Sequence, residues 1–319
     1  MNISIIIPNY NGEEILKKNL PKVFEAVFSH RGGEVEIIII DDCSTDNSIK
    51  EISYQISHIK NTYQKLMTSI KFFKNDKNLG FSSTINRGVN ESNGDIAILL
   101  NTDVVPKKDF LQPLLRHFSD PLVFAVGCMD ESVENGGVVS RGRGIGLWKR
   151  GFLVHSRGEV NKLNTLWVSG GSGAFRKNIW EKLGGLDSLY NPFYWEDIDL
   201  SYRALKSGYK IAFEPRSVVI HRHEKGAIKK RYSESEVKTI AYRNQFIFVW
   251  KNATDLELQF SHMLWLPYHF ARALVSGDLN FLIGFCLAIL RLPQVVISGF
   301  RAQKYFTKSD REVVEEFSK

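Results

Sequence analysis

The residues that follow the apolar run 96–100 are polar and suited to bind a ligand. This run contains only aliphatic side chains, which is typical of a strand buried on both faces of a sheet. Asn101, Thr102 and Asp103 follow it directly. Asn and Asp also favour turns, so an ordinary turn explains this strand end when it is considered alone. The Asp103 carboxylate could equally serve as an oxygen ligand for a divalent cation.

A second acidic group, Glu196-Asp197-Ile198-Asp199, follows the aromatic residues 193–195. From residue 200 onward, residues repeat at three-to-four spacing, which predicts a helix that begins near Glu196. Glu196 and Asp197 would then lie in its first turn, where the helix dipole favours an ionised carboxylate. Acids are also common at this position in ordinary helices, so the spacing alone leaves a structural role open.

The elements that must position these groups alternate between short apolar runs and longer amphipathic stretches. Strands are expected at 3–8, 35–41, 70–75 and 96–100, and helices at about 13–28, from 46 onward and within 80–92. Repeated alternation of strand and helix predicts parallel strands joined by right-handed crossovers. We therefore expect an α/β protein with an open, mostly parallel sheet and helices on both faces.

Ligands of such sheets bind beyond the carboxyl ends of the strands. The first expected strand ends in PNYNG (Pro8 to Gly12), and the second ends in Asp41 and Asp42. No GxGxxG follows the first strand and the chain has no P-loop, so a glycine turn does not hold phosphates here. A nucleotide bound at this edge would need a divalent cation for its diphosphate, and Asp103 is a suitable ligand.

Six motifs in series resemble one known family. They are SIIIPNYNG, IIIIDDCSTDNS, NLGFSSTINRG, LLNTDVVP, SGGSGAFRK and YWEDIDLSYRALKSGY. In this order they resemble inverting family-2 glycosyltransferases of the GT-A fold, in particular a rhamnosyltransferase-like bacterial or archaeal subgroup. The resemblance covers about residues 3–227. It implies a GT-A domain at 1–228, a C-terminal helical region at 229–319, and a nucleoside-diphosphate sugar (a UDP- or dTDP-sugar) as donor.

The resemblance also implies which residues bind the donor. Tyr10 would pack near the nucleobase, Asp42 would accept hydrogen bonds from the base or ribose, and Asp41 would support that loop. The full set implied for the nucleotide sugar is Pro8, Asn9, Tyr10, Asn11, Asp41, Asp42, Asn78, Gly80, Phe81, Asn86, Asn101, Thr102 and Asp103.

The metal and the catalytic base are likewise implied by the resemblance. Asp103 matches the last carboxylate of the family's metal-binding DxD motif, and His221 is the implied second ligand for Mn²⁺ or Mg²⁺. His221 shares one strand face with His223 by alternation. The chain departs from the motif at Asn101, which replaces the first Asp, although an amide oxygen can still coordinate. Asp197 matches the family's catalytic base, with Glu196 as the alternative.

These roles describe a single displacement on a sugar. A carboxylate that takes the proton of the acceptor hydroxyl accelerates such a step by about 10²–10⁴-fold. A bound cation stabilises the departing diphosphate, so Asp103 and Asp197 are expected to face each other across the sugar. The residues expected to contact the sugar or acceptor are Gly171, Ser172, Gly173, Trp195 and Glu196. Trp195 could stack on the sugar or belong to the core.

The C-terminal part of the chain is basic and rich in aromatic residues from about 237 to 306. Its longest uncharged run, Leu279 to Leu290, has 12 residues, and a membrane-spanning helix needs about 20. We expect amphipathic helices that lie on a membrane surface and a lipid-linked or other glycan acceptor; a helical cap on the core is the alternative. Residues 308–317 predict a short final helix. Nucleic acid is not an expected partner, because the basic residues are spread among large aliphatic ones.

Composition sets the remaining bounds. The formal net charge is +7, and its basic excess lies in the C-terminal third. Three cysteines without paired spacing favour a reducing compartment and argue against a disulfide or zinc framework. The N-terminal MNISIIIPNY is interpreted as a first strand rather than a signal peptide. These features predict a cytoplasmic protein at the inner face of the membrane.

Two other functions remain open at this stage. A nucleotidyltransferase uses a similar sheet, but that class usually begins with a glycine- and lysine-rich phosphate loop, unlike PNYNG. A non-catalytic member that binds nucleotide sugar or lipid is the other alternative, and Asn101 makes it credible.

Overall fold

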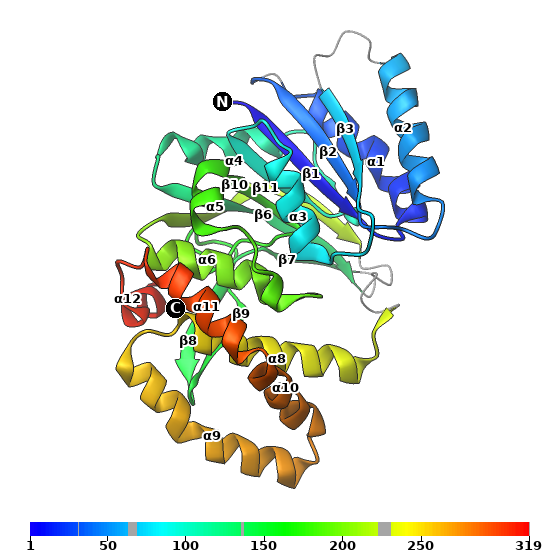
Figure 1. Cartoon of the computed structure of the whole chain (residues 1–319). Coiled ribbons are helices and arrows are strands. Elements are labelled where there is room, and N and C mark those ends of the chain that lie inside the picture. Colours follow the sequence, from blue (N-terminus) through cyan, green and yellow to red (C-terminus); the bar gives the residue numbers. More distant parts are fainter. Residues whose placement is uncertain (31, 63–68, 135–136, 223–230, 319) are drawn as a thin grey trace.

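The computed structural model describes residues 1–30, 32–62, 69–134, 137–222 and 231–318 (Figure 1). Within these residues a nine-stranded sheet has the order β3-β2-β1-β4-β10-β6-β11-β5, with β7 paired to β6. The strands of this sheet are β1 (Ile3–Asn9), β2 (Val35–Asp41), β3 (Ser69–Lys74), β4 (Ile96–Leu100), β5 (Val104–Pro106), β6 (Val123–Glu134), β7 (Gly137–Arg141), β10 (Ser172–Arg176) and β11 (Lys210–Arg222). A separate hairpin joins β8 (Gly144–Lys149) to β9 (Phe152–Arg157).

Four neighbouring strands, β3, β2, β1 and β4, are parallel, as the sequence pattern predicts. Ile5 of β1 is in register with Ile37 of β2 and with Ile98 of β4, and all three side chains are fully buried. The sheet then changes direction at β10, which pairs antiparallel with both β4 and β6. The expected α/β architecture with a mostly parallel sheet is therefore confirmed. The antiparallel position of β10 was not predicted from the sequence.

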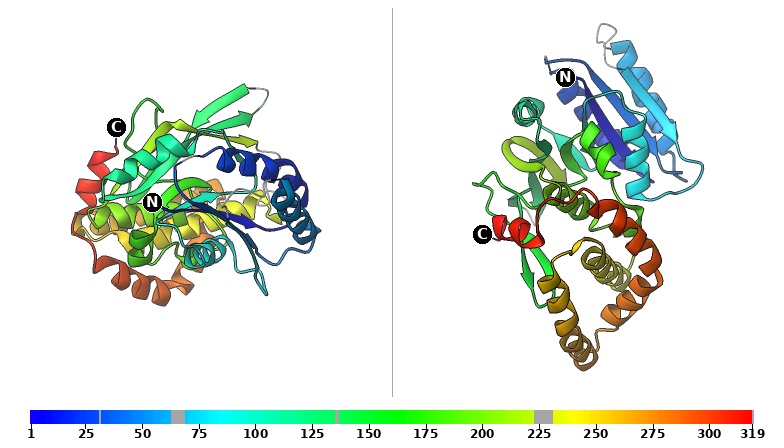
Figure 2. Two further views of the ribbon diagram at one scale, coloured as in Figure 1. Left: turned by 90° about the horizontal axis from the view of Figure 1, so that it is seen from above. Right: turned by 60° about the vertical axis from the view of Figure 1, so that its left-hand side comes forward.

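Helices cover both faces of the sheet (Figure 2). They are α1 (Glu13–Phe28), α2 (Ser48–Thr62), α3 (Phe81–Asn90), α4 (Leu111–Arg116), α5 (Lys177–Leu183) and α6 (Glu196–Lys206), with short 3-10 turns η1 (His117–Ser119) and η2 (Ser188–Tyr190). Alternate residues of β1 enter different hydrophobic clusters: Ile5 and Ile7 pack with α1, and Ile6 packs with α3. This alternation is what a strand buried on both faces requires.

The C-terminal helices are α8 (Glu234–Asn252), α9 (Leu256–Ser276), α10 (Leu279–Leu290), α11 (Leu292–Gln303) and α12 (Asp310–Glu316). Helix α8 begins at a capping box between Ser233 and Glu236, and its Phe246 and Phe248 are buried in the same cluster as Ile6 of β1. The expected boundary at residue 228 is therefore not a division of the hydrophobic core. Helix α12 is the short final helix predicted for 308–317.

Among the described residues, no single helix has both the length and the apolar composition needed to cross a membrane. Helices α10 and α11 meet that criterion only when taken together, and they are bent by 67° relative to each other.

Candidate active site

The ends of β1 and β2 form one connected polar group. Asn9 donates its side-chain amide to Asp41 Oδ2 at 2.8 Å and to Ser44 Oγ at 3.2 Å. Asp41 in turn accepts the Ser44 N–H and hydroxyl at 2.8 and 2.6 Å. The Asn11 side chain accepts from Thr45 N–H at 2.8 Å. Asp41 thus supports the loop after β2, as expected, and fixes Asn9 and Asn11 beside it.

Asp42 organises the loop that precedes α3. Its carboxylate accepts the N–H groups of Leu79 and Gly80 at 2.8 and 2.9 Å, and the Asn75 amide at 2.7 Å. Asn78 donates to the Asp42 carbonyl at 3.3 Å. A carboxylate has about four lone-pair positions, so Asp42 keeps limited capacity for a base or ribose. Its bonds mainly bring residues 78–80 to the edge of the sheet.

Tyr10 has a partner that the sequence did not suggest. The Arg231 guanidinium lies over the Tyr10 ring at 5.3 Å and over the Tyr232 ring at 5.5 Å. This contact brings the segment before α8 to the end of β1. A cation stacked on an aromatic ring is also well suited to lie beside a nucleotide.

The strand end at Asn101 meets the acidic group of α6 through one turn. The Asn101 N–H donates to the Gly171 carbonyl at 3.0 Å, and the Gly170 N–H points at Asp197 Oδ2 at 3.5 Å. A Cβ at Gly171 would lie 2.7 Å from Asn101 Nδ2, so any larger residue there would require the Asn101 side chain to move. A Cβ at Gly170 would lie 3.3 Å from the Phe81 ring. Residues from three distant motifs therefore converge on the Gly170–Gly171 turn.

The two residues expected to hold a metal are in direct contact. His221 Nε2 lies 3.1 Å from Asp103 Oδ2, and His221 Nδ1 lies 3.2 Å from Asp130 Oδ2. Burial opposes the charge on His221, but the two carboxylates outweigh it and raise its pKa to about 9. Nearby, Asn101 Oδ1 is buried without a hydrogen-bond partner among the described residues. His223, expected on the same strand face, lies outside the described residues.

This donor set suits a divalent cation that also binds phosphate. Asp103 supplies a carboxylate oxygen, and Asn101 Oδ1 is a buried acceptor that lacks a partner among the described residues. His221 would supply an imidazole nitrogen after a cation displaces the proton that Asp103 and Asp130 favour. No group of three or more His, Cys, Asp or Glu side chains in the described part of the chain has the geometry of a complete metal site. A cation held here would therefore need ligands from the diphosphate and water.

Glu196 and Asp197 begin α6, as the spacing predicted. Burial, followed by the charge of Asp197, raises the pKa of Glu196 to about 8. Burial also raises the pKa of Asp197, against the N–H groups of Ile198 and Gly170 that favour its charge. Glu196 Oε2 is buried without a hydrogen-bond partner among the described residues. A pair with raised pKa values at a helix start is a candidate for proton transfer.

Trp195 corrects one expectation. It is 6% exposed and packs against His155 and Phe248, both with ring centroids 5.1 Å away, so it is a core residue rather than a platform for a sugar. Tyr194 is 44% exposed and is the accessible aromatic at this position. Tyr194 and Trp195 have left-handed φ angles of 68° and 76°. Two consecutive left-handed non-glycine residues are strained, and surrounding contacts must hold them.

Asn244 of α8 supplies those contacts. Its side-chain amide donates to the carbonyls of Tyr190, Phe193 and Tyr194, each at 2.9 Å. Arg243 donates to the Asn191 carbonyl at 2.6 Å and to the Asn244 oxygen at 2.9 Å. The C-terminal region thus holds the loop that presents Glu196 and Asp197.

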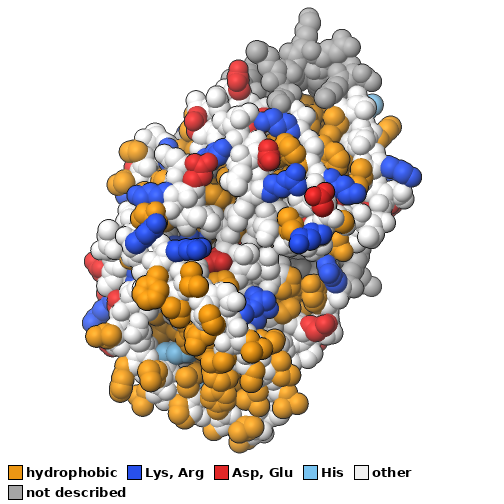
Figure 3. Space-filling view, viewed as in Figure 1, with side chains coloured by type: hydrophobic (Ala, Val, Ile, Leu, Met, Phe, Trp, Pro, Cys, Tyr) orange, Lys and Arg blue, Asp and Glu red, His pale blue; other side chains and the backbone are white. Residues whose placement is uncertain are grey.

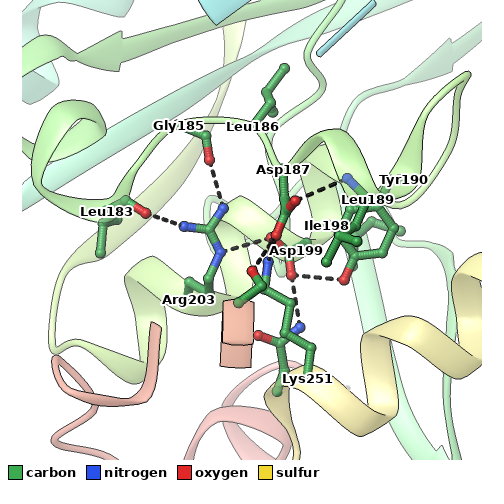
Figure 4. Close-up of polar contacts among 12 residues, drawn as sticks. Leu183, Gly185, Leu186, Asp187, Leu189, Tyr190, Ile198, Asp199, Arg203 and Lys251 are labelled. Carbon is green, nitrogen blue, oxygen red and sulfur yellow. Dashed lines mark hydrogen bonds and ion pairs between the residues drawn. The ribbon is translucent and has the colours of Figure 1, made fainter. Parts of the chain in front are cut away.

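Asp199 is the centre of a buried network that joins α6 to α8 (Figure 4). It accepts from Arg203 at 2.7 Å, from Lys251 at 2.9 Å, and from the Tyr190 hydroxyl at 2.8 Å. Burial alone would raise the pKa of Asp199, but Arg203 and Lys251 hold it well below its usual range. Lys251 also bonds Asp187 at 2.7 Å. Asp199 is therefore structural, and it anchors the helix that carries Asp197.

Three further expected residues, Asn86, Ser172 and Gly173, have structural roles. Asn86 accepts the Leu186 N–H at 3.0 Å and donates to the Leu186 carbonyl at 2.7 Å, so both its polar atoms serve the loop before α6. Ser172 and Gly173 are buried in β10, and a Cβ at Gly173 would lie 2.4 Å from Val168. Their small size therefore allows the strand to pack closely. Of residues 171–173, only Gly171 lies at the turn beside Asn101.

Sequence reasoning missed Arg231, Asn244 and Lys251, because residues beyond 228 were expected mainly to lie on a membrane surface, with a helical cap on the core as the alternative. One signal was present in the sequence. Arg243, Asn244, Lys251 and Asn252 interrupt an otherwise apolar and aromatic stretch of α8, and all four are buried. Buried polar side chains need partners, so such interruptions indicate specific contacts.

Comparison with known proteins agrees with this arrangement. The sequence model described as "Glycosyl transferase family 2" matches residues 4–184. Over 229 residues the chain is 27% identical to the O-antigen chain rhamnosyltransferase RfbN of Salmonella typhimurium. The aligned region covers 70% of this chain and 67% of that protein. Over 233 residues it is 26% identical to the probable glycosyltransferase YdaM of Bacillus subtilis, covering 68% of this chain and 49% of that protein.

Two solved structures of similar fold contain UDP or a UDP-sugar. GalNAc-T7 with UDP, GalNAc and Mn²⁺ superposes with a TM-score of 0.59 and 19% identity, over 79% of this chain and 48% of that chain. Staphylococcus aureus TarS 1-349 with UDP-GlcNAc superposes with a TM-score of 0.58 and 14% identity, over 99% and 91% of the two chains. The chain spans about half the length of YdaM and of GalNAc-T7. Because the family model matches more than half of this chain, the chain belongs to glycosyl transferase family 2.

Proposed function

We propose that the protein transfers a sugar, with inversion, from a nucleoside-diphosphate sugar to a hydroxyl group of a glycan or lipid-linked acceptor. Asp197 acts as the general base, and Asp103 with His221 holds a divalent cation. The sugar is a hexose or deoxyhexose, and the donor nucleotide is UDP or dTDP. RfbN, a rhamnosyltransferase by name, supports a deoxyhexose.

The observation that carries this proposal is the turn at Gly170 and Gly171. Its Gly171 carbonyl binds the strand end that leads to Asp103, and its Gly170 N–H points at Asp197. One short segment therefore links the carboxylate assigned to the donor diphosphate with the carboxylate assigned to the acceptor. A single displacement needs these two functions on opposite sides of the same sugar.

The acceptor proton goes to Asp197. Burial raises the pKa of this carboxylate, which makes it a stronger base than an exposed Asp. Glu196, with its pKa raised to about 8, is protonated at neutral pH and leaves Asp197 as the ionised member of the pair. The hydroxyl oxygen then attacks the anomeric carbon as the bond to the diphosphate breaks.

The diphosphate end is organised by the strand termini. Asp103 and His221 would hold the cation, Mn²⁺ or Mg²⁺, and Asn101 Oδ1, two residues before Asp103 in the chain, is an additional buried acceptor. When bound, the cation neutralises charge that develops on the leaving diphosphate. The nucleobase would bind at the end of β1 beside Tyr10. The stacking of the Arg231 guanidinium over the Tyr10 ring supports this placement.

We also propose that the reaction takes place at the inner surface of the cell membrane. The C-terminal helices expose large apolar side chains, which supports an acceptor that is anchored in lipid.

A thermal-shift screen of UDP-, dTDP- and GDP-sugars, with and without Mn²⁺, tests the donor assignment. A ligand at 100 times its dissociation constant stabilises the folded state by about 2.7 kcal/mol, so the correct donor raises the melting temperature. The donor identified in this way is then used for transfer, and nuclear magnetic resonance reads the anomeric configuration of the product. Retained configuration, or no donor shift and no donor hydrolysis with either cation, would refute the proposal.

A further inference from the structure

Helix α9 has two apolar faces although only one of them is packed. Its Ala273 is buried and its Leu266 and Phe270 pack on the core. The opposite stripe, spaced at three to four residues, is exposed: Phe260, Met263 and Leu264 are 67%, 69% and 64% exposed, and Val275 is 91% exposed. A helix that is apolar on all sides is normally buried on all sides.

Helices α10 and α11 repeat this arrangement. In α10, Phe281 and Ala288 are buried, while Leu279, Ile283 and Leu290 are exposed. In α11, Val295 and Ala302 are buried, while Val296, Ile297 and Phe300 are exposed. We call the exposed apolar stripes of α9, α10 and α11 the apolar foot. Figure 3 shows hydrophobic side chains gathered over this end of the molecule, far denser than on the rest of that face.

The charges beside the apolar foot are mostly basic. Exposed Arg272 lies in α9, exposed Arg301 in α11, and Lys304 directly after it. The turn between β8 and β9 adds Arg150, which donates to the Tyr268 hydroxyl at 2.8 Å and stacks over the Trp265 ring at 5.6 Å. Asp278, between α9 and α10, is paired with Lys238 at 2.9 Å.

The foot is rigidly attached to the loop that carries the candidate base. Arg291, at the bend between α10 and α11, donates to the Leu189 carbonyl in η2. Ser298 of α11 donates to Asp187, which also binds Lys251 of α8. Because the bend is bonded to the catalytic domain, α10 and α11 are held as two separate segments against α8 and do not form one straight span.

We propose that the apolar foot docks on the surface of an anionic lipid bilayer, with α9, α10 and α11 lying in the interface. Apolar stripes bordered by Trp, Tyr and Arg are the composition of interfacial helices, and the basic side chains complement anionic headgroups. Through the bonds of Arg291 and Ser298, the docked foot would fix the position of Glu196 and Asp197 relative to the membrane. This last consequence rests on the proposed transferase function, whereas the docking itself does not.

Flotation of the full-length chain with vesicles tests the docking. We expect the protein to float with vesicles of equimolar phosphatidylglycerol and phosphatidylcholine, and more weakly with phosphatidylcholine alone. The triple variant Leu264→Glu, Val275→Glu, Phe300→Glu places three charges in the foot and should lower the vesicle-bound fraction more than about tenfold. The matched control Val138→Glu, Leu163→Glu changes two exposed apolar residues outside the foot and should bind as the wild type does.

Charge reversal provides an independent readout. Arg272→Glu with Arg301→Glu should reduce binding to the anionic vesicles and remove its salt dependence, with little change on phosphatidylcholine alone. Donor hydrolysis should be unchanged in the triple variant, so a loss of vesicle binding is separable from a loss of the catalytic site. If wild type floats but turns over no donor, the transferase proposal fails and the docking remains.

Three outcomes would overturn the docking. The wild type could stay with the soluble fraction for both vesicle compositions. The triple variant could bind as well as wild type. Finally, wild type could be a dimer by light scattering while the triple variant is a monomer and neither binds vesicles, which would assign the foot to a second copy of the chain.

Discussion

Lys251 of α8 and Asp199 of α6 form an ion pair in which neither side chain is more than 1% exposed, with 2.9 Å between Nζ and Oδ2. Asp199 lies two residues after Asp197, so this pair joins the helix of the candidate base to the C-terminal region. A charge buried at this depth is tolerated only while its partner remains.

Removal of the lysine charge should therefore destabilise the protein strongly. Lys251→Met leaves Asp199 and Asp187 without their shared cation, and we expect the free energy of unfolding to fall by about 3–5 kcal/mol in urea titrations. The exposed pair of Lys210 with Asp120 is the matched control, because Lys210→Met should cost about 1 kcal/mol or less. Equal losses in the two variants would contradict the structural role of Lys251.

Asp197→Asn should abolish the base without disturbing the fold. We expect kcat to fall by about 10²–10⁴-fold, since the neutral amide cannot take the acceptor proton. Donor binding by calorimetry should stay close to the wild-type value, because the strand ends that hold the nucleotide are unchanged. The exposed Asp109→Asn is the control and should keep wild-type turnover. Wild-type kcat in Asp197→Asn would remove this residue from the mechanism.

Glu196 should make stability depend on pH. Its pKa is about 8 in the folded state against an ordinary value of 4.5, so the folded chain binds its proton more tightly than the unfolded chain does. The stabilising contribution is complete below pH 4.5 and declines as the pH rises toward about 8, by at most about 1.4 kcal/mol per pH unit.

The measurement is the difference in unfolding free energy between wild type and Glu196→Gln across this range. Gln cannot ionise, so the variant should gain stability relative to wild type as pH increases from 4.5 to 8. A difference that stays constant with pH would show that Glu196 has an ordinary pKa.

Asn244→Ala should affect turnover more than donor affinity. The variant removes the Asn244 hydrogen bonds to three loop carbonyls, of which the Tyr190 carbonyl also accepts from Arg243, at a cost of about 1–3 kcal/mol in unfolding free energy. Because the strained residues Tyr194 and Trp195 then relax, Glu196 and Asp197 lose their position and kcat falls, with the donor KM near wild type. Asn280 is the control: it is half-buried and accepts the hydroxyl groups of Ser235 and Thr239 rather than bonding this loop. Equal effects of Asn280→Ala and Asn244→Ala on kcat would contradict the positioning role.

Gly171→Ala tests the turn that joins the two motifs. The added methyl would lie 2.7 Å from Asn101 Nδ2 and would displace the Asn101 side chain, whose Oδ1 is the buried acceptor near the start of the Asp103 loop. We expect weaker donor binding in the presence of Mn²⁺, measured by calorimetry. Gly127→Ala in β6 is the control, since its nearest neighbour would be at an ordinary 3.7 Å. Unaltered donor affinity in Gly171→Ala would show that this close approach is not needed.

The sequence was most informative where one periodic pattern dominates. The bounds of α1 and β2, and the start of α6 at Glu196, agree with the sequence pattern. Helix α1 repeats its apolar residues at helical spacing, and β2 is a mostly aliphatic run that is buried along its whole length. The strand β10 was missed because its short SGAFR segment lacks the alternation or β-branched run of an obvious strand. Its place between β4 and β6 depends on distant residues that no local pattern encodes.

The candidate site was predictable by motif, but its support was not. Asp103 and His221 come into contact as their shared assignment suggested. Trp195 turned out to be buried because α8, with Phe248, packs over it. The hydrogen bonds of Asn244 join residues that are about fifty positions apart in the sequence. Contacts of this range follow from tertiary packing rather than from local propensity.

The bonds that Asn244 and Lys251 of α8 make to the preceding domain limit which parts of the chain can be exchanged with those of a related protein. Chimeras that exchange acceptor preferences by splicing at residue 228 would separate Asn244 and Lys251 from the carbonyls and carboxylates they were selected to fit. Arg291 and Ser298 extend the same dependence into α11. A stable chimera should therefore take the N-terminal domain and the C-terminal helices from the same protein.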